Sequence, residues 1–214
     1  LPVVVAVGGC GPQVAEKVKK HAEAIKVGEG MGEGVEMGPV ISAKAKDRIV
    51  GLIDDAEKRG SKVVLDGRGL TVPGYENGHF LGPTVLDDVP LDAPVYTEEV
   101  FGPVLAIVHA DTYEEALKIV NAQPFGNGSA IFTNDGGVAR RFTLDVEAGM
   151  VGVNVPIPTP VAFYSFGGWK ESLLGDTHIH GPEGVTFYTR AKAITERWPT
   201  EKTYAATMSF QREE

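Results

Sequence analysis

Short apolar runs alternate in this sequence with longer segments in which apolar residues recur every three or four positions. The runs have the length of strands and lie at residues 3–7, 62–66, 104–110, 129–133 and 150–155. The first of them is continuously apolar, which is typical of a strand buried on both faces in a parallel sheet. The sequence therefore predicts an α/β fold, with a mainly parallel sheet flanked by helices.

Capping and stop residues mark where the predicted helices begin and end. Four helices are expected: one from Pro12 to about Val27, one from Ser42 to Gly60, one that begins at Asp111 or Thr112, and one at about residues 135–146. Because helices and strands alternate between about residues 104 and 155, this region is expected to consist of repeated βα units with right-handed crossovers and a largely parallel sheet.

Charge and composition exclude several classes of protein. The net charge of −9 disfavours nucleic acid or an anionic membrane as a partner, since both require clustered Lys and Arg. No apolar run approaches the roughly 18 residues that a membrane-spanning helix needs. A single cysteine in 214 residues excludes an internal disulfide framework and fits a reducing compartment.

The single cysteine, Cys10, lies in the stretch VAVGGCGPQVAEK, near a predicted helix start. Backbone N–H groups and the helix dipole lower the pKa of a thiol at such a position, so Cys10 can be a nucleophile. The alternative is a partly exposed thiol in a turn. The residues around Cys10 leave both interpretations open.

The stretch VGEGMGEGVEMG at 27–38 is rich in glycine, which suggests a phosphate-binding loop. A helix rather than a strand is expected before it, and it matches neither of the glycine-rich phosphate-binding motifs. A flexible connector is the favoured interpretation.

The stretch DTHIHGPE contains Asp176, His178 and His180 at alternate positions. On a strand, these three side chains would share one face and could hold a metal ion. No fourth ligand or cysteine cluster accompanies them. Solvated loop histidines are therefore favoured, and no metal site is expected.

Three segments in fixed order carry a resemblance to a known family: YTEEVFGPV at 96–104, PFGNGSAIFTND at 124–135, and MVGVNV followed by SFGGWKES within 150–172. With MGPVIS, GHFLGPTVL and YTRAKAIT, they resemble the C-terminal half of the aldehyde dehydrogenase superfamily over nearly the whole chain. The wording of VNVPIPTPVAFYSFGGWK and GYENGHFLGPTV is most similar to the methylmalonate-semialdehyde dehydrogenases, which make acyl-CoA products.

The resemblance bears on the question of the nucleophile. In this family the nucleophilic cysteine comes just before a buried strand, which here is the run from Pro2 to Val7. The resemblance therefore places the nucleophile about three residues before Leu1 and makes Cys10 a bystander. No catalytic residue is expected within the chain, which is interpreted as a fragment that is inactive by itself.

The resemblance also implies roles for three side chains. Glu99 corresponds to the glutamate that accepts hydrogen bonds from the hydroxyls of the nicotinamide ribose, and Phe101 offers a flat surface to the same part of NAD. Phe166 is expected to contact substrate in the funnel that the FGGWK segment closes. The alternative for the first pair is a helix-capping acid and a core phenylalanine. Trp169 and Lys170 are interpreted as structural, and Glu98 as a helix-end or surface charge.

By this resemblance the intact protein oxidises malonate or methylmalonate semialdehyde with NAD as cofactor and coenzyme A as co-substrate, with loss of carbon dioxide. It is expected in the cytoplasm, or in the mitochondrial matrix of a eukaryote. A non-acylating aldehyde dehydrogenase and a non-enzymatic assembly or binding module are the alternatives.

The expected organisation is a catalytic domain at residues 1–184, an oligomerisation arm at 185–198 and a tail at 199–214. The arm alternates along VTFYTRAKAITERW, and neither of its faces is apolar enough for a central strand. An unpaired edge strand recruits another chain, so a dimer or tetramer is expected.

Overall fold

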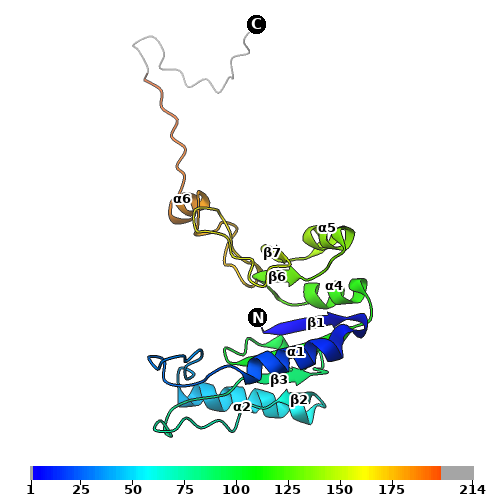
Figure 1. Cartoon of the computed structure of the whole chain (residues 1–214). Helices are drawn as coiled ribbons and strands as arrows, with labels where there is room; N and C mark the ends of the chain where they lie inside the picture. The colour runs from blue at the N-terminus through cyan, green and yellow to red at the C-terminus, as the bar shows by residue number, and fades with distance from the viewer. Residues whose placement is uncertain (1, 199–214) are drawn as a thin grey trace.

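A four-stranded sheet forms the centre of the amino-terminal part of the protein, in a computed structural model that describes residues 2–198 (Figure 1). The strands lie in the order β1 (Val3–Val7), β4 (Val104–Ala110), β3 (Thr84–Asp87) and β2 (Lys62–Leu65). Strands β1 and β3 run parallel to β4, whereas β2 runs antiparallel to β3. The mainly parallel sheet predicted from the sequence is confirmed.

Helices cover both faces of this sheet. Helix α1 (Gly11–Glu23) packs on one face, and α2 (Ala43–Lys58), the short α3 (Pro94–Thr97) and α4 (Tyr113–Asn121) pack on the other. The core on the α1 side contains Ala6, Ala15, Val85 and Ile107. The larger core on the opposite side draws apolar side chains from strands and helices alike, among them Ile49, Ile53, Leu86, Val95, Ala106, Val108 and Ile119.

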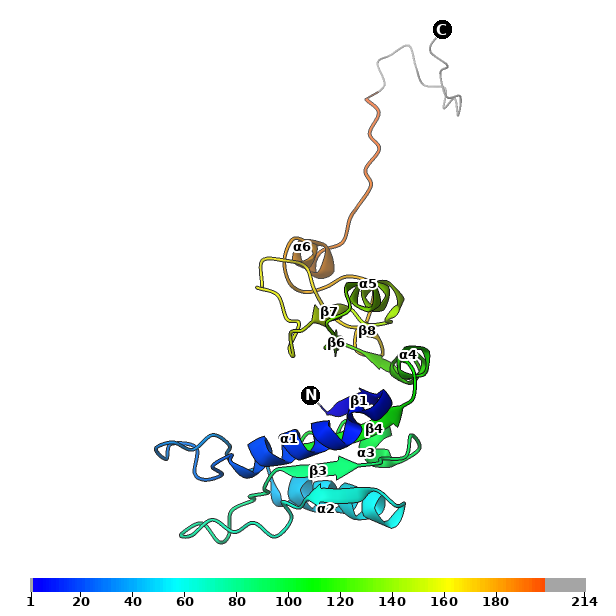
Figure 2. The ribbon, with the colours of Figure 1, turned by 45° about the vertical axis from the view of Figure 1, so that its right-hand side comes forward.

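Helix α4 joins the sheet to a smaller carboxy-terminal unit (Figure 2). Ala116 and Ile119 face the large core, whereas Leu117 and Val120 pack against a third apolar cluster, which is centred on Phe142. This unit contains the parallel pair β6 (Gly128–Ile131) and β7 (Met150–Val153), helix α5 (Gly136–Asp145), and the short antiparallel pair β5 (Phe125–Gly126) and β8 (Trp169–Lys170). Helix α4 thus has apolar residues on two sides and connects the large core of the sheet to the cluster around Phe142.

The predicted helix caps are present. Ser42 Oγ accepts a hydrogen bond from the amide of Ala45 at 3.1 Å at the start of α2, and Thr112 caps α4 in the same way. Asp135 caps α5, and the hydrogen bonds from the amides of Val138 and Gly137 keep the pKa of its carboxyl below the ordinary value. These caps satisfy amide groups that have no partner within the helix.

Three local expectations are corrected. Helix α1 ends at Glu23 rather than near Val27. The glycine-rich segment after it, predicted to be a flexible connector, is a folded loop, because Gly28 N donates to Met37 O at 3.0 Å and Lys26 Nζ donates to Glu33 O at 2.7 Å. In addition, β1 lies at the edge of the sheet and is only partly buried.

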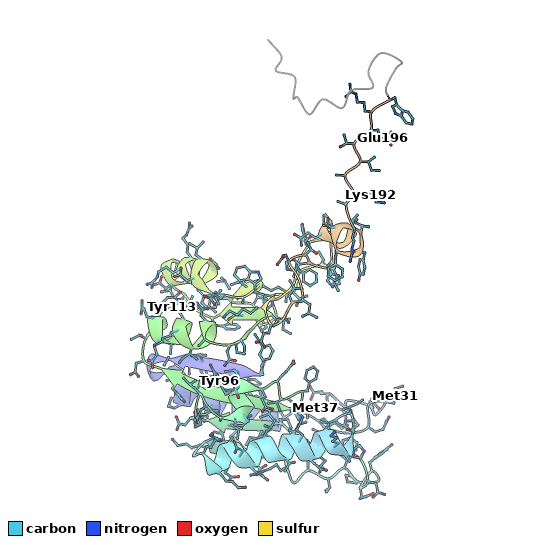
Figure 3. The ribbon with its side chains drawn as sticks, turned by 180° about the vertical axis from the view of Figure 1, so that it is seen from behind. Met31, Met37, Tyr96, Tyr113, Lys192 and Glu196 are labelled. Carbon is cyan, nitrogen blue, oxygen red and sulfur yellow. The ribbon has the colours of Figure 1, made fainter. Side chains whose placement is uncertain are left out.

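The prediction of a strand at residues 185–198 is wrong for its first four residues. Residues 185–188 belong to helix α6 (Glu183–Tyr188), whose first turn is fixed by a hydrogen bond from Glu183 N to Ser165 Oγ at 3.2 Å. Residues 189–198 have no regular secondary structure, and Lys192 and Glu196 lie on a segment that leads away from the rest of the protein (Figure 3). The predicted tail at 199–214 lies outside the described residues. None of the helices within residues 2–198 is long and apolar enough to cross a membrane.

Candidate active site

Residues Glu99 to Pro103, here the EVFGP loop, connect helix α3 to strand β4. The amide of Glu98 donates to the carbonyl of Pro94 at 2.9 Å, which ends α3. Val100 is buried at 2% exposure, whereas its neighbours Glu99 and Phe101 are exposed, Phe101 at 77%. The buried valine anchors the loop and leaves the two predicted cofactor-binding side chains at the surface, which does not fit a core phenylalanine at position 101.

Helix α2 holds the EVFGP loop in place through two contacts. A guanidinium nitrogen of Arg48 donates a hydrogen bond to the carbonyl of Val100. A Cβ added to Gly102 would lie 2.5 Å from Cδ1 of Ile49, so glycine is required for this close packing. Phe101 adopts φ +47°, an uncommon conformation for a residue with a side chain. Contacts on both sides of Phe101 therefore fix its backbone.

Arg48 and Ile49 were not identified from the sequence as parts of the site. They lie about fifty positions before the loop that they contact, and within α2 Ile49 has the spacing of an ordinary core residue. No local pattern distinguishes them. Only the packing of α2 against the sheet brings them to the EVFGP loop.

The beginning of strand β1 lies beside the end of the EVFGP loop. In the parallel pair, Val3 is opposite Ala106, and the amide of Ala106 donates to the carbonyl of Pro2 at 3.0 Å. The carbonyl of Pro103 accepts from Thr84 on the other side at 2.8 Å. The amino ends of β1, β4 and β3 therefore lie at the same edge of the sheet as the EVFGP loop.

Cys10 lies beyond the opposite end of β1. It follows that strand in the short 3₁₀ helix η1 (Gly8–Cys10), is exposed, and is the residue before α1. Five residues of strand at about 3.3 Å each place it roughly 16 Å or more from the start of β1. Cys10 and the EVFGP loop are at opposite edges of the sheet.

Near the Cys10 edge, Asp87, Asp88 and His109 form the only group of three side chains within residues 2–198 that could share a metal ion. His109 Nε2 lies 2.7 Å from Asp87 Oδ1, and Lys62 Nζ lies 2.6 Å from Asp88 Oδ2. The hydrogen bond from Lys62 holds the pKa of Asp88 below its ordinary value. These groups are already paired with one another, so their arrangement does not call for an ion.

Phe166 lies in a second loop, residues 166–169, here the FGGW loop, whose last residue, Trp169, begins strand β8. The half-buried ring of Phe166 stacks on the ring of His180, with centroids 4.6 Å apart and planes 6° from parallel. Lys170, directly after the loop, donates to the carbonyls of Asn121 and Gln123 at the end of α4, at 2.6 and 3.1 Å. These bonds support a structural role for Lys170.

The histidines of DTHIHGPE have different surroundings from those predicted. His178 and His180 are half-buried rather than solvated: His178 Nδ1 lies 3.1 Å from Glu183 Oε2, and His180 stacks on Phe166. Within residues 2–198, Asp176 is not grouped with them in a cluster that could hold a metal ion. This segment supports the FGGW loop, which alternation along the sequence could not indicate.

Comparison with known proteins identifies the family to which this fold and these loops belong. The aldehyde dehydrogenase family model matches residues 3–194. The chain belongs to the aldehyde dehydrogenase family. The resemblance inferred from the three ordered segments is thereby confirmed.

Among its relatives, a malonate-semialdehyde dehydrogenase of Pseudomonas aeruginosa is 48% identical over 209 residues, which cover 95% of this chain and 42% of the relative. A methylmalonate-semialdehyde/malonate-semialdehyde dehydrogenase (acylating, mitochondrial) of Bos taurus is 46% identical over 89% of this chain and 35% of its own length. The chain therefore spans about two fifths of the length of the relatives that it matches.

Solved structures show the same similarity. A Sinorhizobium meliloti structure, described as a methylmalonate-semialdehyde dehydrogenase complexed with NAD, superimposes with a TM-score of 0.88 at 46% identity and covers 94% of this chain and 41% of the other. A methylmalonate-semialdehyde dehydrogenase of Oceanimonas doudoroffii gives 0.87 at 45% identity over 92% of this chain and 41% of its own. The fold of this chain is that of an aldehyde dehydrogenase.

The contact between Gly102 and Ile49 gives a first prediction. Gly102→Ala should destabilise the protein by about 1 to 3 kcal/mol, because the new methyl group would overlap Cδ1 of Ile49. Ile49→Val removes that carbon, so the double variant should lose less than the sum of the two single changes. Urea unfolding measures all three. Gly38→Ala, where nothing lies within 4 Å of the added carbon, is the matched control. Additive losses would contradict the contact.

Proposed function

We propose that this chain is the carboxy-terminal part of an NAD-dependent, coenzyme A-acylating dehydrogenase of malonate or methylmalonate semialdehyde. The observation that carries the proposal is the position of Pro2 beside the residues that follow the EVFGP loop. A nucleophilic cysteine a few residues before Leu1 would lie near Glu99 and Phe101, whereas Cys10 lies at the opposite edge. The cytoplasmic or mitochondrial location expected from the resemblance belongs to the same proposal.

The residues of the EVFGP loop fit a cofactor of the NAD type. The carboxylate of Glu99 is exposed and has no hydrogen-bond or ion-pair partner within residues 2–198, so both of its oxygens are free to accept bonds from two adjacent ribose hydroxyls. Phe101 presents an exposed flat ring two residues further on. When bound, NAD would accept the hydride that leaves the aldehyde carbon. The role of this chain is to hold the ribose and the ring in position.

The reaction balances without a further reactant. The semialdehyde carboxylate, coenzyme A thiol and NAD⁺ give acyl-CoA, carbon dioxide and NADH: the aldehyde carbon is oxidised, and the thiol proton ends on the carbon from which carbon dioxide leaves. In this proposal Phe166 lines the path of the semialdehyde. The names of the Pseudomonas and Bos taurus relatives support this substrate class, and the word acylating in the second supports coenzyme A.

Product analysis tests the proposal. The full-length protein, supplied with malonate semialdehyde and NAD, should form acetyl-CoA only when coenzyme A is present, because the thiol takes up the acyl group. Mass spectrometry of the products measures this. Cys10→Ser in the same protein should retain nearly all of the activity.

Other results would favour the alternatives. Free acid as the product at any coenzyme A concentration would indicate a non-acylating aldehyde dehydrogenase. Absence of NADH formation from any aldehyde would favour the non-enzymatic module.

Glu99→Gln gives a prediction about the cofactor. Loss of a charge-assisted hydrogen bond, worth about 1.5 to 3 kcal/mol, should weaken NAD-dependent rate constants roughly 10- to 150-fold, with little change in stability. Steady-state kinetics at varied NAD measures this effect, and thermal unfolding measures stability. Glu98→Gln is the matched control, because the neighbouring acid is interpreted as a surface charge. An unchanged NAD dependence in Glu99→Gln would exclude the ribose contact.

The proposal also assigns self-association to residues 185–198. Apolar side chains there are strongly exposed, among them Val185, Tyr188, Ile194 and Trp198. Burial of such side chains against another subunit would remove them from water. Light scattering of the full-length protein should give the mass of a dimer or tetramer, and deletion of residues 185–214 should reduce it. An unchanged multimeric mass would show that assembly depends on another surface.

A further inference from the structure

We propose that His180 is a positioning residue, which fixes the ring of Phe166 in the orientation that contacts substrate. This inference rests on the proposed function, because it assumes that Phe166 lines the path of the semialdehyde. His180 lies in the DTHIHGPE segment, outside both the EVFGP loop and the FGGW loop.

The stacking contact itself restricts the Phe166 ring. The two rings lie 6° from parallel at 4.6 Å between centroids, and both residues are half-buried. A flat neighbour at this distance favours the ring plane that lies parallel to it, because a tilted ring would lose the stacking contact. The neighbouring aromatic residues Phe163 and Tyr164 contact each other instead, with 4.4 Å between their ring centroids. Within residues 2–198, His180 is the only ring that stacks on Phe166.

Backbone contacts fix His180 relative to the segment before Phe166. The amide of Gly181, the next residue, donates to the carbonyl of Ala162 at 3.1 Å. Gly181 has φ +66°, and a Cβ there would lie 2.3 Å from the amide nitrogen of Ser165. Ser165 Oγ in turn accepts from the amide of Glu183 at 3.2 Å. The position of His180 therefore follows from the contacts that the residues directly after it make with the segment 162–165.

His178 supports the adjacent residue in the same loop. Glu183 Oε2 accepts from the amide of His178 at 3.0 Å and lies 3.1 Å from Nδ1 of the same residue. The imidazole so held lies against Gly167, where an added Cβ would be 2.4 Å from Cδ2 of His178. Two histidines, two positions apart, thus contact two successive residues of the FGGW loop. The segment 178–183 is a framework for that loop.

The flat ring, rather than the volume, of His180 is the property that the proposal requires. His180→Leu keeps a side chain of similar size but has no planar face, and His180→Phe keeps the planar face without a titratable proton. In the full-length enzyme, His180→Leu should raise the KM for malonate semialdehyde about 2- to 10-fold, because an aromatic stack is lost. The KM for NAD should not change. His180→Phe should stay within about 2-fold of the parent for both.

Two further measurements separate positioning from a general loss of structure. His21→Ala, an exposed histidine on α1, is the matched control and should behave as the parent. Hydrogen exchange of residues 162–168 should be faster in His180→Leu than in His180→Phe. Equal KM values for the semialdehyde in the Leu and Phe variants, or an equal rise in the KM for NAD, would overturn the proposal.

Phe166→Ala distinguishes this inference from the proposed function. If Phe166→Ala raises the KM for the semialdehyde and His180→Leu does not, the substrate role of Phe166 stands and the role of His180 is wrong. If Phe166→Ala leaves that KM unchanged, the substrate role of Phe166 fails, and the inference fails with it. If the parent forms no NADH from the semialdehyde, the proposed function fails, whatever the exchange measurement shows for the loop.

Discussion

Strand β4 accepts a parallel neighbour on each edge, and the arrangement of the candidate site depends on this pairing. Ala106 lies opposite Val3 of β1 and opposite Leu86 of β3, so three strands are aligned at their amino ends. Side chains of β4 are buried on both faces, with Ile107 toward α1 and Val108 toward α2 and α4. A strand held on four sides cannot shift its register without exposing both cores. The loop before β4 is therefore fixed at one edge of the sheet.

Glycines at close contacts allow the two loops of the candidate site to pack tightly against neighbouring segments. Gly102 packs against Ile49, and a Cβ on Gly149 would lie 1.9 Å from the carbonyl oxygen of Gly167. Gly167 in turn packs against His178. A Cβ at any of these positions would overlap its neighbour, so a side chain there would move a loop away from its support, and the absence of Cβ sets the position of both loops. The close packing of the glycine backbone also fixes the neighbouring exposed side chains, such as Phe101 beside Gly102.

Local patterns predicted most elements of this fold, because the physical signals are local. Ser42 and Thr112 are caps in the structure, and the run at residues 104–110 is a strand over its full length. The start of the predicted arm failed for the opposite reason: alternation at residues 185–188 is outweighed by the tertiary bond between Glu183 and Ser165, which starts a helix. Arg48 on the EVFGP loop and His180 on Phe166 are likewise long-range contacts. Spacing within one segment cannot indicate either.

The two edges of the sheet offer different chemistry, which decides where a reaction could occur. In open α/β sheets, ligands commonly bind beyond the carboxyl ends of the strands, which here is the edge with Cys10 and His109. At that edge Asp87 and Asp88 are already paired with His109 and Lys62, so little polar capacity is left for a ligand. At the amino edge, the Glu99 carboxylate has no partner within residues 2–198. The parallel pairing of β1 with β4 places the loop that carries this free carboxylate at the same edge as the start of β1. The candidate site therefore lies at the amino edge of the sheet, not at the carboxyl edge where ligands commonly bind.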